Sequence, residues 1–378
     1  MSGLHFHPLR VRELRPEGDD ALTITFDVPT PQAASFHFQP GQYLTLRADV
    51  AGQDLRRSYS ICAAPGEALR VGVRRVPGGA FSSWLHDSLK AGDTLDVMEP
   101  QGHFGTALSH HLHGSRQSRQ SRQSHDLHDW QRSHSSRHVL AVAGGSGITP
   151  ILSIIKTLLR EDPRSRCTLL YGNRRVASMM FREELEDLKN SHLRRVVLQP
   201  VFSRETVDTP LHAGRLDAEK IATLLRLASP FDEAFVCGPH GMNDEVEAAL
   251  QVAGMAPEHI HVERFGVPPS AADATLHAPQ PGDATTAIIT IVRDGLSRDV
   301  AFQPSDDSVL AAASRAGMDV PYSCRSGVCA TCRARLLHGR VRMDRNFALE
   351  KDELAAGFVL TCQAHPLTGR VVVSFDER

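Results

Sequence analysis

The sequence has no long hydrophobic run. No stretch approaches the roughly 20 apolar residues of a membrane-spanning helix, and the opening segment MSGLHFHPLRVREL lacks the apolar stretch of a signal peptide. We therefore expect a soluble, cytoplasmic protein. The formal net charge is only −2 over 378 residues, so there is no electrostatic case for a nucleic acid or a membrane surface as a partner.

The sequence also lacks a disulfide framework. Seven cysteines are an odd number, in a chain of 378 residues that is long enough to bury two or three cores without cross-links. Three of the cysteines lie together in SCRSGVCATCRAR, residues 323–335, called here the cysteine loop. In a reducing compartment such crowding indicates metal binding or redox chemistry. Cys62, Cys167 and Cys237 stand apart from this loop.

The chain divides into five segments by pattern. Residues 1–106 hold short alternating stretches between Gly and Pro turns, which predicts an antiparallel β-barrel. Residues 107–137 carry a triple SRQ repeat and many histidines without periodicity, which predicts a disordered insert loop and no metal site. Residues 138–265 alternate strands with helices, which predicts an α/β domain with a parallel sheet. Residues 266–285 are typical of a linker, and residues 286–378 of a small α+β domain.

The cysteine loop has the spacing C-x4-C-x2-C, and a fourth cysteine follows in LTCQAHP. Cys324, Cys329, Cys332 and Cys362 match the ligand run of a plant-type [2Fe–2S] cluster. A zinc site is the alternative, although its usual signature is two C-x2-C pairs and only one is present. Small residues between the ligands favour the iron–sulfur cluster, because they let backbone N–H groups turn toward the sulfurs. The segment resembles a plant-type ferredoxin domain, which implies a β-grasp fold.

A glycine-rich loop follows the first apolar strand of the α/β segment. In AVAGGSGITP, Gly144, Gly145 and Gly147 let the backbone approach a pyrophosphate, and the N-terminus of the next helix supplies N–H groups for it. We expect that helix to begin at Pro150, with Thr149 as its cap. The pattern is not the G-x-G-x-x-G fingerprint, and alone it would fit a purely structural turn almost as well.

Two more stretches of this segment follow strands. VCGPHGM places Cys237, Gly238 and Pro239 at a strand end, where open parallel sheets bind their ligands. FSRE places Ser203 and Arg204 at another, where a guanidinium can grip a phosphate with two hydrogen bonds.

Taken together, these stretches resemble the NADP module of the ferredoxin–NADP reductase family. The resemblance implies that Cys237 lies beside the nicotinamide, although a buried structural thiol is the simpler explanation of Cys237 taken alone. An expected preference for NADPH over NADH rests on Arg204, with Arg174 of YGNR in support.

The first segment contains a candidate flavin site. In RRSYSICAAP, Arg57, Ser58, Tyr59 and Ser60 span the R-x-Y-S motif of the same family. The resemblance implies that the Arg pairs with the flavin pyrophosphate, the Tyr stacks on the isoalloxazine and the Ser bonds near N5. The residue types suit those tasks, since they offer a charge for a phosphate, an aromatic face for a ring and a hydroxyl for a polar atom.

Two further stretches complete the expected flavin site. VPGGAFSSWLHD brings Gly79, Phe81 and Ser82 to the start of a helix whose N–H groups can meet a second phosphate oxygen. HVERFG places Glu263 near the flavin by the same family resemblance, although a plain boundary strand explains it nearly as well. We expect three residues to be catalytic: Ser60, Cys237 and Glu263.

The three sites form one electron chain, from NADPH through FAD to a [2Fe–2S] cluster and on to an external acceptor. This domain order resembles the reductase components of multicomponent oxygenases. AGGSGITP, LLYGNR and ALEKDELAAGFVLTCQAHPL resemble most the reductase subunits of bacterial phenylacetyl-CoA epoxidases, a family that implies a di-iron oxygenase as partner. The alternatives are another acceptor, such as a Rieske dioxygenase or a hybrid-cluster protein, and a zinc-bearing nucleotide-sensing module.

Basic side chains surround the cysteine loop. We expect them to meet an acidic patch on the electron acceptor, although a solvated basic face is an equal alternative. The five residues are Arg325, Arg333, Arg335, Arg340 and Arg342.

Overall fold

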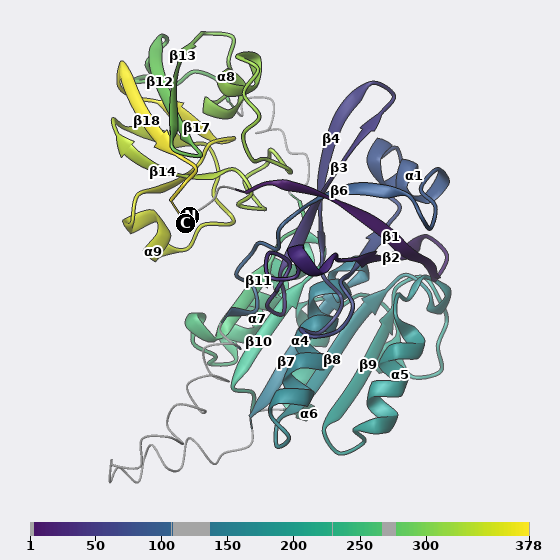
Figure 1. Ribbon diagram of the computed structural model, residues 1–378. Helices are drawn as coiled ribbons and strands as arrows, with labels where there is room; N and C mark the ends of the chain where they lie inside the picture. The colour runs from purple at the N-terminus through teal and green to yellow at the C-terminus, as the bar shows by residue number, and fades with distance from the viewer. Residues whose placement is uncertain (1–3, 107, 109–136, 229, 267–276, 378) are drawn as a thin grey trace, which may run out of the picture.

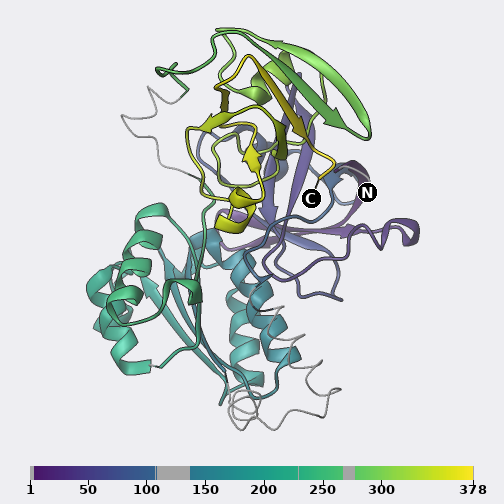
Figure 2. The ribbon, with the colours of Figure 1, turned by 90° about the vertical axis from the view of Figure 1, so that its left-hand side faces the viewer.

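The computed structural model describes residues 4–106, 108, 137–228, 230–266 and 277–377. Three large sheets follow one another along the chain, and a two-stranded sheet of β15 and β17 belongs to the last domain. Figures 1 and 2 show the C-terminal domain beside the N-terminal barrel and the parallel sheet below the barrel. Almost all of the predicted insert and half of the predicted linker lie outside the described residues. None of the described helices is long and apolar enough to cross a membrane.

The N-terminal domain is the predicted antiparallel barrel. Its six strands are ordered β4-β3-β6-β1-β2-β5, and the two edges meet where Ile61 bridges Val71 and the Cys62 N–H donates to the Arg70 carbonyl at 2.9 Å. Alternating apolar side chains fill the interior. The elements are β1 (Phe6–Glu17), β2 (Ala21–Asp27), β3 (Tyr43–Val50), β4 (Gln53–Ser60), β5 (Arg70–Arg74), α1 (Ala80–Asp87) and β6 (Thr94–Met98).

The second domain is the predicted parallel sheet, ordered β11-β10-β7-β8-β9. Alternate residues of β7 face opposite layers: Val139 and Ala141 pack with α4 and α5, whereas Leu140 and Val142 pack with α6 and α7. The sequence does not predict the helix α7 after Pro239, because the glycine and proline of CGPHGM indicate only a ligand loop. The elements are β7 (His138–Gly144), α4 (Ile148–Glu161), β8 (Arg166–Asn173), α5 (Arg182–Ser191), β9 (Val196–Phe202), α6 (Ala218–Ala228), β10 (Glu233–Cys237), α7 (His240–Val252) and β11 (Ile260–Glu263).

The C-terminal domain is a mixed sheet, ordered β13-β12-β18-β14-β16, in which only β12 and β18 are parallel. The Ser308 hydroxyl caps α8 by accepting from the Ala311 N–H at 3.2 Å. The cysteine loop follows α8 and ends within the first residues of β14. The elements are β12 (Ala287–Arg293), β13 (Leu296–Phe302), α8 (Val309–Arg315), β14 (Arg333–His338), β15 (Val341–Met343), α9 (Lys351–Ala355), β16 (Phe358–Leu360), β17 (Ala364–Pro366) and β18 (Arg370–Ser374).

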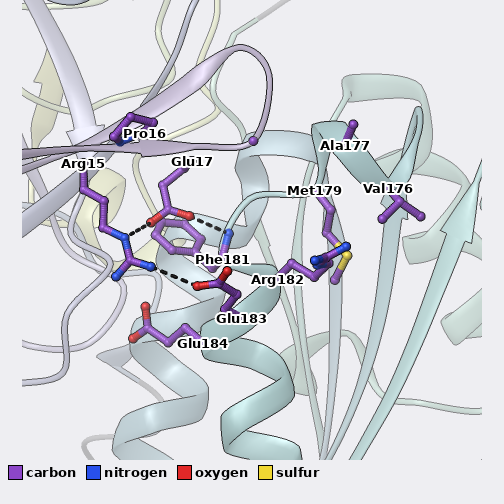
Figure 3. A pocket seen from close by; sticks show the side chains of 11 residues that line it. Arg15, Pro16, Glu17, Val176, Ala177, Met179, Phe181, Arg182, Glu183 and Glu184 are labelled. Carbon is purple, nitrogen blue, oxygen red and sulfur yellow. Dashed lines mark hydrogen bonds and ion pairs between the residues drawn. The ribbon is translucent and has the colours of Figure 1, made fainter.

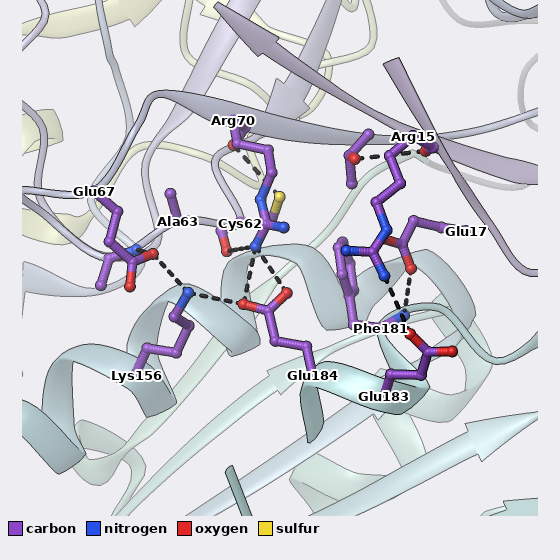
Figure 4. A network of polar contacts seen from close by, with 12 residues as sticks. Arg15, Glu17, Cys62, Ala63, Glu67, Arg70, Lys156, Phe181, Glu183 and Glu184 are labelled. Atoms are coloured by element: carbon purple, nitrogen blue, oxygen red, sulfur yellow. Dashed lines mark hydrogen bonds and ion pairs between the residues drawn. The ribbon is translucent and has the colours of Figure 1, made fainter. Parts of the chain in front are cut away.

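A network of ion pairs fastens the barrel to the parallel-sheet domain (Figure 4). Glu184 on α5 pairs with Arg70 of the barrel at 2.8 Å and with Lys156 on α4 at 2.8 Å, and Lys156 also reaches Glu67 at 2.6 Å. Burial opposes ionisation of Glu184, but the two cations outweigh it and lower its pKa. The network therefore stabilises the junction near neutral pH and weakens as the pH falls.

A cavity of about 270 Å³ lies at the same junction (Figure 3). Glu17 accepts from the Phe181 N–H at 3.1 Å, and Arg15 pairs with Glu183 at 3.2 Å on its rim. None of the predicted site residues lines this cavity. We therefore assign it to the seam between the two domains.

The network predicts unequal effects of two neighbouring glutamates. Glu184→Ala leaves Arg70 and Lys156 without their shared, partly buried anion, which costs about 2 kcal/mol. The melting temperature, followed by flavin fluorescence on heating, should fall by about 4–8 °C. Glu183→Ala is the control, because its pair with Arg15 is 73% and 56% exposed at the side chains and contributes less than about 1 kcal/mol. Equal melting temperatures for the two variants would contradict this role.

Candidate functional site

The predicted nucleotide residues lie along one edge of the parallel sheet. The carboxyl ends of all five strands lie at this edge. From β7 the chain adds β8 and β9 on one side and then β10 and β11 on the other, so the strand order reverses between β7 and β10. Open α/β sheets bind their ligands at such a point. Cys237, which ends β10, pairs with Ala143 of β7 and with Glu263 of β11. The structure thus brings to this edge Gly144, Gly145, Gly147, Arg174, Ser203, Arg204, Cys237, Gly238, Pro239 and Glu263.

The glycine loop and the Cys-Gly-Pro turn touch each other. A Cβ on Gly147 would overlap the carbonyl oxygen of Cys237, and one on Gly144 would lie 2.6 Å from Cδ of Pro239. A Cβ on Gly238 would lie 3.0 Å from the Gly144 nitrogen. Glycine is required at Gly147, where a Cβ would meet the backbone of Cys237. At Gly144 and Gly238 the nearest obstacles are the side chains of Pro239 and Met242.

The helix after the glycine loop begins two residues earlier than predicted. α4 starts at Ile148 with Gly147 as its N-cap, so Thr149 is not the cap and Pro150 is not the first helical residue. The reason is a 3-10 turn, Gly145–Gly147, that runs directly into the helix. The Thr149 hydroxyl lies inside the first turn, where it donates to the Ser146 carbonyl at 3.0 Å.

Arg204 and Arg174 lie side by side. The Arg204 N–H donates to the Arg174 carbonyl at 2.8 Å, and the Ser203 N–H donates to the Asn173 carbonyl at 2.9 Å. The Arg174 guanidinium is held by Asp20 of the barrel, whereas Arg204 is exposed and makes no ion pair with any described residue. Of the two, Arg204 therefore has the guanidinium that can grip a phosphate.

The R-x-Y-S motif occupies the end of β4. Arg57 is exposed and donates to the Arg56 carbonyl at 2.7 Å, and Ser60 is buried. The Tyr59 ring lies almost parallel to that of Phe81 on α1, at 20° with centroids 6.3 Å apart. Burial raises the pKa of Tyr59, so its hydroxyl stays protonated.

The turn before α1 is held by one of the predicted residues. Ser82 is buried, and its hydroxyl accepts from the Val76 N–H at 3.0 Å and donates to the Gly79 carbonyl at 3.3 Å. Gly79 is the N-cap of α1. The structure thus places Gly79, Phe81 and Ser82 together at the start of the helix, with Phe81 against Tyr59.

The face of β4 that is opposite to Arg57 and Tyr59 contacts the C-terminal domain. Ser58, which we expect to bind a cofactor, donates to the hydroxyl of Ser323, the residue before the first cysteine, at 2.9 Å. Arg56 is 5% exposed, pairs with Asp319 at 2.6 Å and lies 4.3 Å from the Tyr322 ring centroid. The buried Arg56 guanidinium, covered by Tyr322 and paired with the half-exposed carboxylate of Asp319, holds the C-terminal domain against this strand.

Tyr43 joins the barrel to the cysteine loop, and sequence reasoning missed it. It pairs with Ser60 in the β3–β4 ladder, and its hydroxyl donates to the carbonyl of Cys329 and lies 3.1 Å from the Thr331 hydroxyl. Burial raises the pKa of Tyr43 well above its usual value, which keeps the donor proton in place. The sequence carries no signal for this contact, since 286 positions separate the two residues.

A cavity of about 440 Å³ opens where all three domains meet. Its lining includes Tyr43 and Phe104 of the barrel, Glu263 of the parallel sheet, and Cys329 and Phe347 of the C-terminal domain. Its volume is in the range of small-molecule sites. Burial raises the pKa of Glu263 to about 8, so this carboxyl is neutral at pH 7 and can donate a hydrogen bond.

The four predicted ligand cysteines lie as two pairs. The thiol of Cys329 hydrogen-bonds Cys324 and lowers its pKa below the usual value, despite burial. Cys332 in the same way lowers the pKa of Cys362. The Ser326 N–H donates to Cys324 Sγ at 3.4 Å. Four converging sulfurs with N–H groups aimed at them fit an iron–sulfur cluster.

Two of the cysteines outside the loop are structural. Cys62 and Cys167 are fully buried, and burial raises the pKa of each to about 12. Cys237 is also buried with its pKa raised, but its place at the ligand-binding edge separates it from the other two.

The predicted basic rim is largely neutralised. Arg333 pairs with Glu353, Arg335 pairs with Glu377 at 2.9 Å, and Arg342 is bound by Asp283 at 2.7 Å and by Asp344. Arg325 lies with its guanidinium 4.5 Å from the Tyr322 ring centroid. Three of the five arginines therefore already have a carboxylate partner within the domain, and the expected contact with an acidic acceptor stays a prediction.

Three domain families match the chain in order. The oxidoreductase FAD-binding domain matches residues 8–105, the oxidoreductase NAD-binding domain 141–248 and the 2Fe-2S iron-sulfur cluster binding domain 291–367. Over 381 residues the chain is 44% identical to one of the subunits of 1,2-phenylacetyl-CoA epoxidase from Escherichia coli (strain K12), covering 99% of this chain and 98% of that one. The chain belongs to this family of three-domain reductases.

A second relative and a solved structure are similar over almost the whole chain. The ferredoxin reductase component of 3-ketosteroid-9-alpha-monooxygenase from Rhodococcus rhodochrous is 32% identical, over 97% of this chain and 96% of that one. The crystal structure of phthalate dioxygenase reductase, described as modular for electron transfer from pyridine nucleotides to [2Fe-2S], superimposes with a TM-score of 0.56 at 23% identity, over 98% of each chain.

These matches confirm the fold class, the oxidoreductase class and the three cofactor classes. They also decide between the iron–sulfur cluster and the zinc site in favour of the cluster. The domain boundaries and the roles of individual site residues stay predictions.

Glu263 predicts a pH dependence of stability. Its pKa is about 8 in the folded chain against an ordinary 4.5, so between these values the folded protein holds a proton that the unfolded chain releases. Stability must therefore fall as the pH rises through this window and level off above it. Glu263→Gln removes this titration. From pH 6 to pH 8 the melting temperature of the wild type should therefore fall by about 5 °C more than that of the variant. An equal fall in the two proteins would show that Glu263 ionises normally.

Proposed function

We propose that this protein is the reductase component of a phenylacetyl-CoA epoxidase and delivers electrons from NADPH to its di-iron oxygenase. The support is the 44% identity over almost the full length to a component of that enzyme, against 32% to a ketosteroid monooxygenase reductase. The observation that carries electron delivery is the Tyr43 contact, which joins the R-x-Y-S strands to the cysteine loop.

Each end of the relay has its own residues in this proposal. Arg57, Gly79 and Ser82 hold the flavin phosphates, and Tyr59 and Ser60 contact the ring. When bound, FAD accepts a hydride from NADPH and releases single electrons to the [2Fe–2S] cluster. The glycine loop and the turn at Cys237 hold the nicotinamide nucleotide, since their backbones meet at the switch point of the sheet.

Glu263 and Tyr43 border the space between these parts. A neutral Glu263 avoids placing a buried negative charge beside a site that receives hydride. Tyr43 and the Arg56–Asp319 pair hold the cysteine loop against the barrel, which keeps the two redox sites close. Cys324, Cys329, Cys332 and Cys362 are the proposed cluster ligands.

A reconstituted oxygenase assay tests the proposal. With NADPH, the wild-type chain should support turnover by the oxygenase component of 1,2-phenylacetyl-CoA epoxidase. This turnover should be at least about tenfold faster than turnover by the oxygenase component of 3-ketosteroid-9-alpha-monooxygenase, which corresponds to a preference of about 1.4 kcal/mol. Equal or reversed rates would overturn the choice of partner. Absorbance should show flavin and iron–sulfur bands that bleach on anaerobic addition of NADPH, whereas a zinc-bearing module would be colourless.

The cluster is the exit in this proposal, and Cys324→Ser tests that step. The variant should reduce ferricyanide with NADPH at the wild-type rate, because the barrel and the parallel sheet are untouched, but oxygenase turnover should be lost. Cys167→Ala, a buried cysteine outside the loop, is the matched control and should keep both activities. Oxygenase turnover that survives in Cys324→Ser would place the exit elsewhere.

The nucleotide preference depends on Arg204. Arg204→Ala removes a charge-assisted grip on the 2′-phosphate and should raise KM for NADPH about tenfold or more, with KM for NADH unchanged. Arg226→Ala, an exposed arginine on α6, should leave both constants as they are. A wild-type protein that prefers NADH would overturn the assignment.

A further inference from the structure

Two histidines and one aspartate meet where the chain enters the C-terminal domain. Asp344 follows β15, His365 lies in β17, and the two strands pair with Arg342 opposite His365. His277 comes from the segment before the first strand of the domain. Nδ1 of His277 lies 2.7 Å from Oδ2 of Asp344, and Nε2 of His365 lies 2.7 Å from the same oxygen. The two ring nitrogens are 3.4 Å apart.

These three residues, the His-Asp-His group, are shielded from water. The side chains of His365 and Asp344 are 5% exposed, and that of His277 is 21% exposed. The Asp344 N–H donates to the Gln363 carbonyl at 3.0 Å, which fixes the aspartate backbone. In proteins, aspartate side chains are mostly exposed and histidine side chains are intermediate in burial. A buried carboxylate in contact with two imidazoles is therefore an unusual arrangement.

The spacing suits a small divalent ion. Zinc bonds of 2.0–2.1 Å to nitrogen and oxygen place tetrahedral ligand atoms about 3.3–3.4 Å apart. The two nitrogens are already at that separation, and the shared oxygen would need to move back by about half an ångström. Neutral imidazoles and a carboxylate are a donor set that suits zinc. Three protein ligands leave a fourth position for water.

The surroundings balance the charge. The other oxygen of Asp344 is bonded by Arg342, and Arg342 is bonded in turn by both oxygens of Asp283 at 2.7 Å. Two carboxylates and one guanidinium sum to one negative charge, so a dication is not repelled. The hydrogen bond from Arg342 also orients the aspartate, as outer partners commonly do for metal ligands.

We propose that His277, Asp344 and His365 bind one zinc ion, at a site distinct from the four cysteines. The ion ties the segment before β12, which carries His277, to the two-stranded sheet of β15 and β17. It therefore fixes the point at which the C-terminal domain is tethered. This site is independent of the identity of the electron acceptor and of the nucleotide preference.

Zinc retention by the flavin- and iron-loaded full-length protein tests the proposal. The proteins are dialysed against a buffer of about micromolar free zinc and then subjected to elemental analysis. The wild type should retain one zinc ion per chain that His277→Ala lacks, because the variant should bind zinc about tenfold or more weakly. His338→Ala, an exposed histidine on β14, is the matched control and should retain zinc. The histidines of segment 109–136 are kept in every protein and contribute equally to all.

The X-ray absorption spectrum at the zinc edge gives a second readout. It should show two imidazoles with oxygen ligands, and His365→Gln should lose that signature while keeping its iron and flavin. No retained zinc would mean that the group is only a hydrogen-bonded triad. Equal zinc in His277→Ala, or sulfur ligands in the spectrum, would also overturn the proposal.

Discussion

The relay depends on the contact between strands β3 and β4 and the cysteine loop. Electrons pass between bound groups only where the protein holds them close, and here the holding contacts are few. The Tyr43 hydroxyl bonds the Cys329 carbonyl, Ser58 bonds Ser323, and Arg56 is buried against Asp319. Tyr43 and Ser60 are cross-strand partners, so a displacement of the cysteine loop that moves Tyr43 would also move Ser60 of the R-x-Y-S motif.

The parallel sheet serves the same relay from the other side. Its strand order places the glycine loop beside the turn at Cys237, and backbone contact at Gly147 excludes a side chain from that position. The next strand, β11, carries Glu263 to the cavity shared by all three domains. Burial raises the pKa of this carboxyl to about 8, so it is mostly protonated at pH 7.

Ion pairs join two of the domains and reduce the number of unpaired arginines in the third. At one seam, Glu184 shared by Arg70 and Lys156 locks the barrel to the parallel sheet. In the C-terminal domain, carboxylates neutralise Arg333, Arg335 and Arg342. The surface around the cysteine loop is therefore less basic than a count of arginines suggests.

The sequence by itself determined the three domain types and the main local chemistry. Strand alternation, the glycine loop, the R-x-Y-S motif and the spacing of four cysteines are short-range patterns, and each depends on neighbours along the chain. Even so, the sequence pattern predicts a start of α4 at Pro150 rather than at Ile148, because the 3-10 turn that leads into the helix has no signature in the sequence.

Only the tertiary structure decided which distant residues meet. The Tyr43–Cys329 contact, the neutralised arginines, the shared cavity and the His-Asp-His group all join residues that are brought together by domain packing or strand pairing. No spacing rule along one sequence encodes such contacts. They are fixed by how buried surfaces fit and by which charges find partners once the domains have folded.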